Sequence, residues 1–419
     1  MGEKEKIRDY LAYGFTEPFR DPLWKHIYLT PGLKRLTAAP AFQKLSGIKQ
    51  LGPTYMVYPG ATHTRLNHSL GVFALARRII QAIISFDPAG EFTKSGVKAF
   101  LCAALLHDLG HFPYAHSLKE LPLKAHEVLT AEIILDTPLF GLIERHAQTD
   151  PLMVASIIDE SKDSCGSAEI DVYRNILSGV LDPDKLDYLS RDAYFCGVPY
   201  GVQDVDFVIH KLRYHKTEGL VLDEQGLHAV ENVLFSKYLM YRSVYWHKVV
   251  RIATAMIKKA VYSGIRDGAV IPSDLYGLDD YEFFSRYSSG SFAYSSLVND
   301  VWQRKLYKVV AEQPFQPGNP DHEKLLDLDT RSAHEKQICE SLHIDPSKLI
   351  LDIPEPVSFE IDLQIDTGGR LVSFTEAGSV FSRDVIKGFT GALRKMRVMA
   401  HPDILETIQS SGVLSSWKS

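Results

Sequence analysis

A short stretch of the chain, "LLHDLGHFPYAH" at residues 105–116, concentrates histidine and aspartate beside an apolar segment. His107 and Asp108 are adjacent. They end a run at 97–108 that is apolar nearly all round and therefore predicts a buried helix. A carboxylate and an imidazole there need a cation or hydrogen-bonding partners, because an uncompensated buried charge is strongly disfavoured. A divalent metal ion satisfies both groups, and mixed imidazole and carboxylate ligands suit Zn, Fe, Mn, Co or Ni. The stretch thus predicts half of a metal site.

The other ligands must come from other helices, since two protein ligands are too few to hold a metal ion. His68 begins a helical pattern at 67–84, and Asp184 lies in the first turn of another at 182–195. Taken singly, a histidine at a helix start is usually a cap or a surface residue, and the helix dipole favours a first-turn aspartate. Taken as an ordered set on three helices, these residues predict one metal site. The four predicted ligands are His68, His107, Asp108 and Asp184.

The elements that must position this set are predicted from hydrophobic periodicity. Apolar residues recur at helical spacing before residue 265, whereas the alternation typical of strands appears only late. The predicted helices are 67–84, 97–108, 126–135, 151–160, 170–181, 182–195 and one long helix at 231–261, with short helices within 21–52. The predicted strands are 357–365 and 370–375, and the predicted linkers are 318–330 and 352–356. The chain is therefore expected to be mainly α, with a helical domain at 1–265 and a smaller α+β region at 266–419.

Composition and charge narrow the class of protein. No apolar run reaches the roughly 18 residues that a membrane-spanning helix needs, and the charged N-terminus has no apolar signal segment. The net charge of −6 argues against nonspecific nucleic-acid binding as the main role. The cysteines show no CxxC pairing and are expected to be free thiols in a reducing cytosol. They are Cys102, Cys165, Cys196 and Cys339. These features favour a cytoplasmic protein that makes no membrane contact.

The motifs "RLNHSLGV", "LLHDLGHFPYAH" and "LDPDKLDYLSRDA", in this order, resemble those of HD-domain metal-dependent phosphohydrolases. Among these, the chain is most similar to the deoxynucleoside triphosphate triphosphohydrolases. The resemblance extends to "IKQLGPTYMVYPGATHTRLNHSLGV" and "YRSVYWHKVV", so it covers most of residues 20–260. It implies an HD-domain helical core in which the four predicted ligands bind one divalent metal ion per chain. It does not distinguish whether this ion is Mn, Fe, Zn, Ni or Mg. It also implies a homo-oligomer that hydrolyses deoxynucleoside triphosphates to the deoxynucleoside and triphosphate.

The same resemblance implies catalytic and phosphate-binding roles around the metal. His111, His116 and His126 would contact phosphates or transfer protons, a role that suits imidazoles near neutral pH. Arg65, three residues before the first ligand, could grip a phosphate with two hydrogen bonds. Lys185, directly after the last ligand, is a second cation for the phosphates.

Further residues are implied for the sugar and the base. Gln50 would lie near the 3′-hydroxyl and Leu51 would crowd the 2′ position, which implies a preference for deoxyribose. Tyr188 and Asp192 would contact the triphosphate or the sugar, and their spacing from Asp184 places all three on one helix face. Two tyrosines one turn apart, Tyr241 and Tyr245, could stack on a base, although such a pair could equally serve packing.

The chain departs from the vertebrate-type enzymes where these hold an activating guanine nucleotide. Gln43 is the same residue as in those enzymes. Ala38, however, replaces an aspartate that recognises guanine, and Ser46 replaces an arginine. The upstream segment "EPFRDP", which includes Glu17, also lacks the lysine that contacts the activator's phosphate. Activation specific for guanine is therefore not expected. Lys119 replaces a carboxylate, so the proton relay is also expected to differ in detail.

Other functions stay open at this point. An HD hydrolase could act on another nucleotide, such as a nucleoside monophosphate; the GYP motif of cyclic-dinucleotide members is absent, as is a P-loop. A metal-stabilised binding module is disfavoured, since a purely structural site needs no additional histidines. The basic segment at 382–398 is the best support for acting on nucleic-acid ends, but such charges more often form a solvated helix face. The aromatic segment at 281–296 favours oligomerisation, unless it is a packed surface loop of a monomer.

Overall fold

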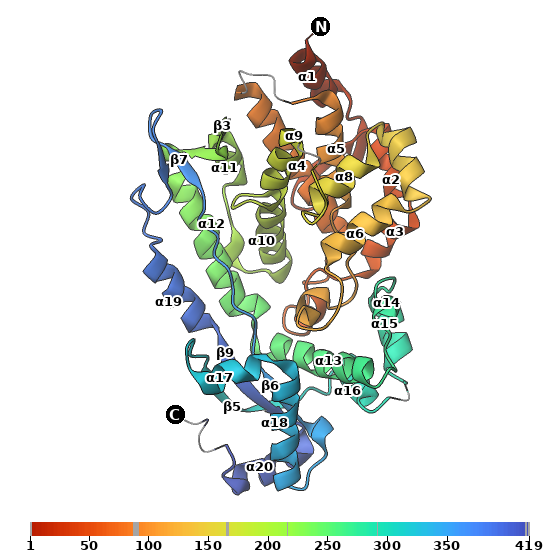
Figure 1. The fold of residues 1–419 in the computed structure, drawn as a ribbon, viewed down its shortest axis with the longest axis vertical. Helices are drawn as coiled ribbons and strands as arrows, with labels where there is room; N and C mark the ends of the chain where they lie inside the picture. The colour runs from red at the N-terminus through yellow and green to blue at the C-terminus, as the bar shows by residue number, and fades with distance from the viewer. Residues whose placement is uncertain are drawn as a thin grey trace.

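The computed structural model describes residues 2–86, 92–164, 167–215, 217–290, 292–414 and 417, and Cys165 lies outside them. The described chain is mainly helical, with small sheets that lie mostly in its second half (Figure 1). This confirms the predicted fold class, a helical core with a smaller C-terminal α+β region. The described cysteines, Cys102, Cys196 and Cys339, are free thiols as predicted. Among the described helices, none combines the length and the apolar character needed to cross a membrane.

The core is built from helices in the first half of the chain. They are α1 (Glu3–Tyr13), α2 (Pro31–Thr37), α3 (Pro40–Gln43), α4 (Arg65–Phe86), α5 (Lys94–Leu106), α6 (His126–Leu135), α7 (Leu139–Leu142), α8 (Pro151–Ile158), α9 (Ala168–Ser178) and α10 (Pro183–Cys196). The sequence of α5 is apolar nearly all round, and its residues from Phe100 to Leu106 are all buried, as predicted. Because α4 packs against both α5 and α10, it joins the helices that carry the predicted metal ligands.

The helices of the second half are shorter on average and more scattered. They are α11 (Val205–Lys211), α12 (Leu227–Met240), α13 (Lys248–Arg266), α14 (Pro272–Leu275), α15 (Asp280–Tyr287), α16 (Ser295–Trp302), α17 (Pro320–Glu323), α18 (Leu328–Ser341), α19 (Arg383–Leu393) and α20 (Leu405–Ser411). The prediction of one long helix at 231–261 was wrong. A π-helical turn at Tyr241–Tyr245 follows α12, and His247 then caps the start of α13 by accepting a hydrogen bond from the Val249 amide. Such π turns are frequent at functional sites.

Three small sheets occur among the described residues. A hairpin pairs β1 (Glu17–Asp21) with β2 (Lys25–Leu29). The second sheet has the order β3-β4-β7-β8, from β3 (Leu212–His215), β4 (Gly219–Asp223), β7 (Gln364–Asp366) and β8 (Leu371–Ser373). The third has the order β5-β9-β6, from β5 (Lys308–Pro314), β9 (Lys395–Ala400) and β6 (Leu349–Asp352). Since β7 pairs in parallel with β4, the C-terminal residues return to the helical half of the chain.

Several predictions for the second half were wrong. Strands also form early, at β1 to β4, where the sequence shows no long alternation. The predicted linker at 318–330 contains α17 and the start of α18. The aromatic segment at 281–296 begins with α15, whose Phe283, Phe284 and Tyr287 are buried inside the chain, so it no longer supports an oligomer. The predicted strand at 357–365 pairs only at its end, in β7, because its earlier residues pack against helices instead.

A buried ion pair connects α13 to the third sheet. Asp352 of β6 is 1% exposed, and Arg251 of α13 donates to it, with Arg251 Nε 3.0 Å from Asp352 Oδ2. Burial alone would raise the pKa of Asp352, but Arg251 and neighbouring cations lower this pKa below its ordinary value. The carboxylate is therefore charged at neutral pH and compensates Arg251.

Replacing Asp352 with asparagine is expected to lower the free energy of unfolding by about 3 kcal/mol, because it leaves Arg251 without a charged partner. Since the pKa of Asp352 is lower in the folded chain, its stabilising contribution is present above pH about 4 and is lost as the pH falls below that value. Urea titrations of both proteins at neutral and acidic pH measure the difference. Asp321→Asn, at a side chain that is 82% exposed, is the control. An equal difference at all pH values would contradict the prediction.

Candidate active site

The predicted metal ligands meet where α4, α5 and α10 come together. His68 and Asp184 lie in the first turns of α4 and α10, and His107 and Asp108 directly follow α5. His68 Nε2 lies 2.8 Å from Asp184 Oδ1. His107 Nε2 lies 3.4 Å from Asp108 Oδ1 and 3.9 Å from Asp184 Oδ1. Atoms that bind one ion at bond lengths of about 2.1 Å lie about 3 Å apart, so the spacing of His68, His107 and Asp184 fits a shared divalent metal, and Asp108 lies beside His107.

The hydrogen bonding of His107 indicates that it is ready to bind a cation. Its Nδ1 lies 3.0 Å from the carbonyl oxygen of Ala104, to which it donates, so the lone pair resides on Nε2. Within the described part of the chain, this buried Nε2 has no hydrogen-bond partner. A buried polar atom without a partner is costly, and a metal ion would satisfy it. The residues present therefore fit a metal.

The second imidazole, His68, is held by a carboxylate that the sequence analysis missed. His68 Nδ1 lies 2.8 Å from Asp187 Oδ2, on the ring edge opposite the Asp184 contact. Asp187 also accepts hydrogen bonds from Arg191 at 2.8 and 2.9 Å and from the Trp24 indole at 2.5 Å. A carboxylate on the far nitrogen fixes the orientation of a metal-binding histidine. The dense charges of "DKLDYLSRD" at helical spacing are the signal that could have revealed this network.

Gly71, one turn after His68, leaves the space that this network needs. A Cβ atom there would lie 1.9 Å from Asp187 Oδ1 and 2.4 Å from an Arg191 nitrogen. The close approach of α4 to α10 therefore requires glycine at this position.

The charges of the site also favour a cation. Burial opposes protonation of His68, but Asp184 and Asp187 outweigh it and raise the pKa of His68 to about 10. Burial likewise would raise the pKa of Asp108, yet the surrounding histidines and Arg65 lower it well below its ordinary value. The carboxylates around His68 thus favour a positive charge at this place, which is a proton on His68 in the free protein and which a divalent ion could supply instead.

Replacing Asp187 with asparagine is expected to weaken metal binding by about 10- to 100-fold while keeping all four ligands. The amide cannot offer Arg191 and His68 the same charge, so the imidazole loses its fixed orientation. Competition with a chelator, followed by metal analysis of the protein, measures the change. Asp171→Asn on α9, at a side chain that is 57% exposed, serves as the control. Unchanged metal affinity in Asp187→Asn would contradict the role assigned to this carboxylate.

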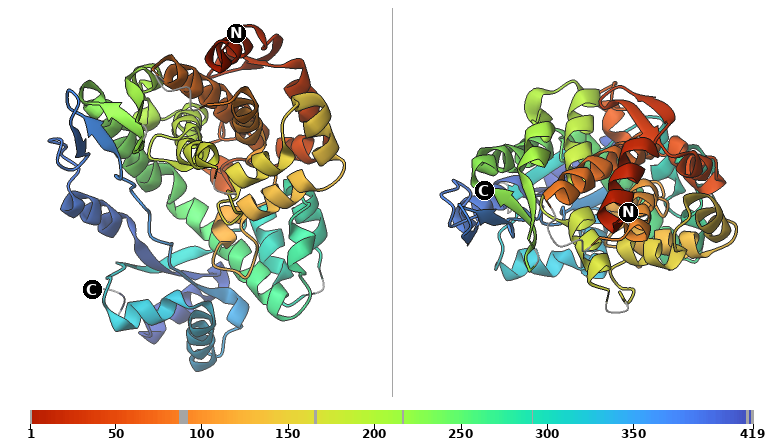
Figure 2. Two further views of the ribbon diagram at one scale, coloured as in Figure 1. Left: turned by 45° about the horizontal axis from the view of Figure 1, so that its top comes forward. Right: turned by 90° about the horizontal axis from the view of Figure 1, so that it is seen from above.

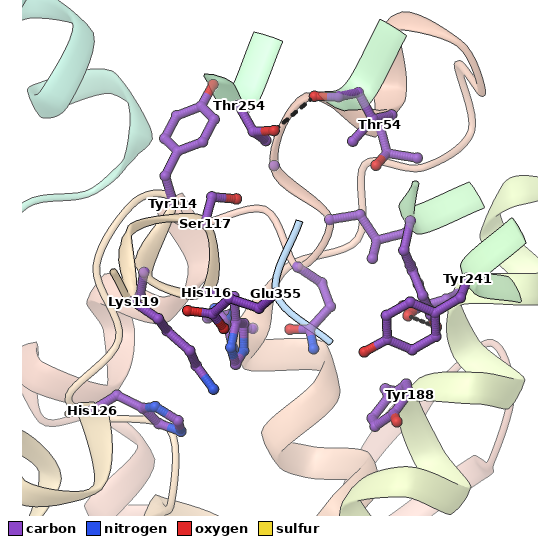
Figure 3. A pocket seen from close by; sticks show the side chains of 18 of the residues that line it. Thr54, Tyr114, His116, Ser117, Lys119, His126, Tyr188, Tyr241, Thr254 and Glu355 are labelled. Atoms are coloured by element: carbon purple, nitrogen blue, oxygen red, sulfur yellow. Dashed lines mark hydrogen bonds between the residues drawn. The ribbon is translucent and has the colours of Figure 1, made fainter. Parts of the chain in front are cut away.

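A cavity of about 640 Å³ opens beside the ligands (Figure 3). All four predicted metal ligands contribute to its lining. So do all but one of the other predicted site residues, namely Gln50, Leu51, Arg65, His116, His126, Lys185, Tyr188, Asp192, Tyr241 and Tyr245. In Figure 3, His116, Lys119 and His126 lie on one side of the cavity and Tyr188 and Tyr241 on the other. The exception, His111, is fully buried behind the lining.

Three histidines form a packed group next to Asp108. The His111 ring lies between the other two, with centroids 3.8 Å from His126 and 4.8 Å from His116. Burial lowers the pKa of His111 well below its ordinary value and that of His126 to about 3, so both are neutral in the free protein. His126 Nδ1 lies 3.2 Å from Glu127, a contact that can orient its ring. His111, with its Nδ1 3.6 Å from Asp108 Oδ1, connects this group to the metal ligands.

The opposite side of the cavity carries polar groups suited to a sugar. Asp192 is buried and accepts a hydrogen bond from Tyr245 at 2.7 Å, and its other oxygen lies 2.7 Å from His63 Nε2. The sequence analysis missed His63, which is buried and stacks on Phe195. The Oε1 atom of Gln50 is buried and, among the described residues, has no hydrogen-bond partner. It can therefore accept a hydrogen bond from a ligand hydroxyl.

Cations also line the cavity. Arg65 is 5% exposed and donates to Asp108 at 2.9 Å. Lys185 is held by Asp182 at 2.5 Å and contacts Glu360 at 3.0 Å. The sequence analysis missed Lys237 of α12, which lines the cavity although it is only 6% exposed. It also missed that Glu360 and its neighbours, which come from the C-terminal half, contribute to the lining.

The positions compared with the vertebrate-type activator site, both the matching Gln43 and the differing Ala38 and Ser46, lie on the surface. Ser46 donates to the main chain of Gln43, whose side chain in turn donates to the carbonyl oxygen of Thr37. The absence of guanine-specific activation thus stays a prediction.

Comparison with known families assigns both halves of the chain. Residues 65–180 match the HD domain, and residues 203–402 match the HD associated region. The uncharacterized protein YwfO of Bacillus subtilis is 36% identical over 251 residues, which are 58% of this chain and 55% of that protein. An uncharacterized protein of Methanocaldococcus jannaschii is 32% identical over 330 residues, 75% of this chain and 66% of that protein.

The deoxynucleoside triphosphate triphosphohydrolase SAMHD1 of Danio rerio is 27% identical over 375 residues, 77% of this chain and 60% of that protein. The chain thus spans about half to two thirds of the length of these curated relatives.

Solved structures share the same fold. A hypothetical protein from Aquifex aeolicus superimposes with a TM-score of 0.73 and 26% identity, covering 94% of this chain and 98% of that chain. A phosphohydrolase from Bacteroides thetaiotaomicron gives a TM-score of 0.69 at 23% identity, over 91% of this chain and 99% of that chain. The HD-domain match includes His68, His107 and Asp108, whereas Asp184 lies between the two matched regions. The chain therefore belongs to the HD-domain phosphohydrolases, with an HD domain followed by an HD-associated region.

Proposed function

We propose that the chain hydrolyses deoxynucleoside triphosphates to the deoxynucleoside and inorganic triphosphate. The observation that carries the proposal is the composition of the cavity. In Figure 3, two histidines and Lys119 lie on one side of it and tyrosines lie on the other; the metal ligands, further cations and Gln50 also line it. Such a cavity suits a molecule with a phosphate chain at one end and a sugar and base at the other. The similarity to the Danio rerio enzyme supports this substrate class.

The residues around the ligands would divide the work of phosphate-ester cleavage. A divalent metal ion, when bound by His68, His107, Asp108 and Asp184, supplies polarisation of the phosphoryl group and acidification of a water molecule. Arg65 and Lys185 would hold the α-phosphate. His116 and Lys119 would contact the other phosphates of the substrate. The oxygen of water bonds to the α-phosphorus while the bond to the 5′-oxygen breaks.

The leaving 5′-oxygen needs a proton, and His126 would supply it. The imidazole faces the cavity and is neutral in the free protein, because burial lowers its pKa to about 3. The negative charge of an incoming triphosphate favours the protonated form of a nearby imidazole. His126 would therefore take up a proton as the substrate binds and deliver it to the 5′-oxygen. His111, which is packed against it, would keep the ring in place.

The sugar side of the cavity would select deoxyribose. Gln50 would accept a hydrogen bond from the 3′-hydroxyl, since its Oε1 has no partner among the described residues. Leu51 would crowd a 2′-hydroxyl. Tyr188 and Tyr245, whose ring centroids are 6.4 Å apart, would pack against the sugar or base. Asp192 would fix Tyr245 through the 2.7 Å hydrogen bond between them.

We also infer that the protein acts in the cytoplasm as a homo-oligomer, without membrane contact. Action on nucleic-acid ends is less favoured, since two of the arginines at 382–398 are buried and occupied. Arg394 donates to the carbonyl oxygen of Pro354 at 2.7 Å, and Arg397 pairs with Glu312 at 2.7 Å. Sedimentation at micromolar concentration tests the oligomer, which a species of monomer mass alone would contradict.

The decisive experiment is product identification with a panel of nucleotides. Purified protein is supplied with Mn, Fe, Zn, Ni or Mg and incubated with deoxynucleoside triphosphates, ribonucleoside triphosphates, nucleoside monophosphates and single-stranded oligonucleotides. We expect inorganic triphosphate and a deoxynucleoside from the first class. Release of orthophosphate or pyrophosphate would place cleavage at another phosphorus and overturn the proposal. Turnover of monophosphates alone would assign the alternative function, an HD hydrolase of another nucleotide.

A further inference from the structure

An extended segment of the HD-associated region crosses the mouth of the active site. We name residues 353–363, between β6 and β7, the acidic strap. It runs beside α12 on its way from the third sheet to the second (Figures 1 and 2). Its residues 355–358 and Glu360 line the same cavity as the metal ligands. The active site is therefore completed by a segment that lies far from the HD motif in the sequence.

The strap is anchored at several points, so its carboxylates have defined positions. Val357, Phe359 and Leu363 are buried in the main core, as the alternation of the sequence requires. The Phe359 ring lies 5.9 Å from that of Phe389 in α19. Arg394 Nε donates to the carbonyl oxygen of Pro354 at 2.7 Å. Between these anchors, the side chain of Glu360 remains 41% exposed and points at the cations of the cavity.

Glu360 contacts two lysines of the cavity at once. Its Oε2 atom lies 3.0 Å from Lys185 Nζ and 3.9 Å from Lys237 Nζ. Lys185 has a second, buried partner in Asp182 at 2.5 Å, whereas Glu360 is the carboxylate that the described residues place within 4 Å of Lys237. Burial lowers the pKa of Lys237, and Glu360 opposes this. A buried cation without an anion is costly, so Glu360 compensates this lysine in the absence of a ligand.

These contacts have the chemistry of a phosphate site occupied by a carboxylate. We propose that Glu360 takes the place of a substrate phosphate on Lys185 and Lys237, so that the acidic strap competes with the phosphate chain for the active site. The inference rests on the proposed function in assuming a substrate that carries a phosphate chain. A phosphate chain carries more negative charge and more acceptor oxygens than one carboxylate, so it can displace Glu360. Another carboxylate of the strap, Glu355, lines the same cavity.

The test compares Glu360→Gln with the wild-type chain by calorimetric titration of inorganic triphosphate, with equal metal loading of both proteins. Removing the competing charge is expected to tighten triphosphate binding by about fivefold to tenfold. Glu360→Ala, which removes the same carboxylate, is expected to change affinity in the same direction. Asp362→Asn, at an exposed position of the strap, is the matched control with unchanged affinity. When Glu360→Gln is added to a protein that already carries Lys237→Met, triphosphate binding is expected to tighten less than when Glu360→Gln is made in the wild-type chain.

Weaker triphosphate binding in Glu360→Gln would indicate a positioning role for this carboxylate. If Glu360 merely orients Lys185, then Glu360→Gln weakens triphosphate binding, and this result or unchanged affinity overturns the inference. A lower KM for the nucleotide in Glu360→Gln supports competition, whereas a lower kcat with unchanged KM contradicts it. The calorimetric readout needs no hydrolysis, so the two proposals can fail separately. Tighter triphosphate binding without turnover of any deoxynucleotide would refute the proposed function and leave the role of the strap intact.

Discussion

Replacing Asp108 with alanine is expected to abolish hydrolysis and to remove the bound metal ion. Asp108 is 3% exposed, and its Oδ1 lies 3.4 Å from His107 Nε2. Its Oδ2 accepts a hydrogen bond from Arg65 at 2.9 Å. One carboxylate thus joins the metal ligands to the cation proposed for the α-phosphate. Without it the site loses a negatively charged ligand that a divalent ion needs, so the activation of water that such an ion would supply is lost with it.

Two measurements check this expectation. Elemental analysis of the purified variant should show a metal content near zero, and the release of deoxynucleoside should fall to background. Asp171→Ala, an exposed carboxylate on α9, should retain both metal and activity. A melting temperature close to that of the wild-type chain excludes unfolding as the cause. Full metal content together with full turnover in the Asp108 variant would sink the assignment of the metal site.

The candidate metal ligands stand out in the sequence because their types and order are unusual, and their assignment as ligands stays a prediction. A His-Asp pair next to a buried helix requires a partner that compensates its charge. This reasoning involves only residues that are neighbours in the sequence. Trp24, which holds the orienting carboxylate Asp187, could not be found this way. The 2.5 Å hydrogen bond from Trp24 to Asp187 joins residues 163 positions apart, and only the packing of the chain brings them together.

The cavity beyond the metal shows the same limit. Gln50, Leu51 and the tyrosines were expected there through a family resemblance, and the structure places them in the lining. Lys237 was missed because a lysine in an apolar helix pattern looks like an ordinary surface residue. Glu360 was missed because the alternation of 357–365 predicts a strand, whereas most of this segment is an extended strap against α12.

The interrupted helix at 231–261 illustrates why local patterns fail at functional sites. Its periodicity fits one continuous helix, and no proline or glycine marks a break. The observed π turn at Tyr241–Tyr245 inserts one extra residue into the helical repeat, which changes the direction of the tyrosines relative to a straight helix. Both tyrosines then line the cavity. The position that the π turn gives to the two tyrosines in the cavity, rather than a local preference of the sequence for a helix break, accounts for this geometry.

Replacing His126 with alanine is expected to lower kcat by about two to four orders of magnitude while the metal ion stays bound. His126 belongs to α6, which contributes none of the four metal ligands. Its ring packs on His111, with a centroid distance of 3.8 Å, and its Nδ1 lies 3.2 Å from Glu127. Loss of the imidazole therefore removes the group proposed to protonate the 5′-oxygen, without changing the four ligands.

Metal content distinguishes a proton donor from a metal ligand, because a variant of His126 should keep the ion that a variant of a ligand loses. Elemental analysis of His126→Ala should match the wild-type chain, and KM should change much less than kcat, since the phosphate-binding cations are intact. His210→Ala, at an exposed histidine of α11, should leave both parameters unchanged. A substrate whose leaving group needs no proton, such as a nitrophenyl ester, should recover most of the lost rate. Loss of metal from His126→Ala, or an equal defect with the nitrophenyl ester, would show that His126 supports the metal site rather than proton transfer.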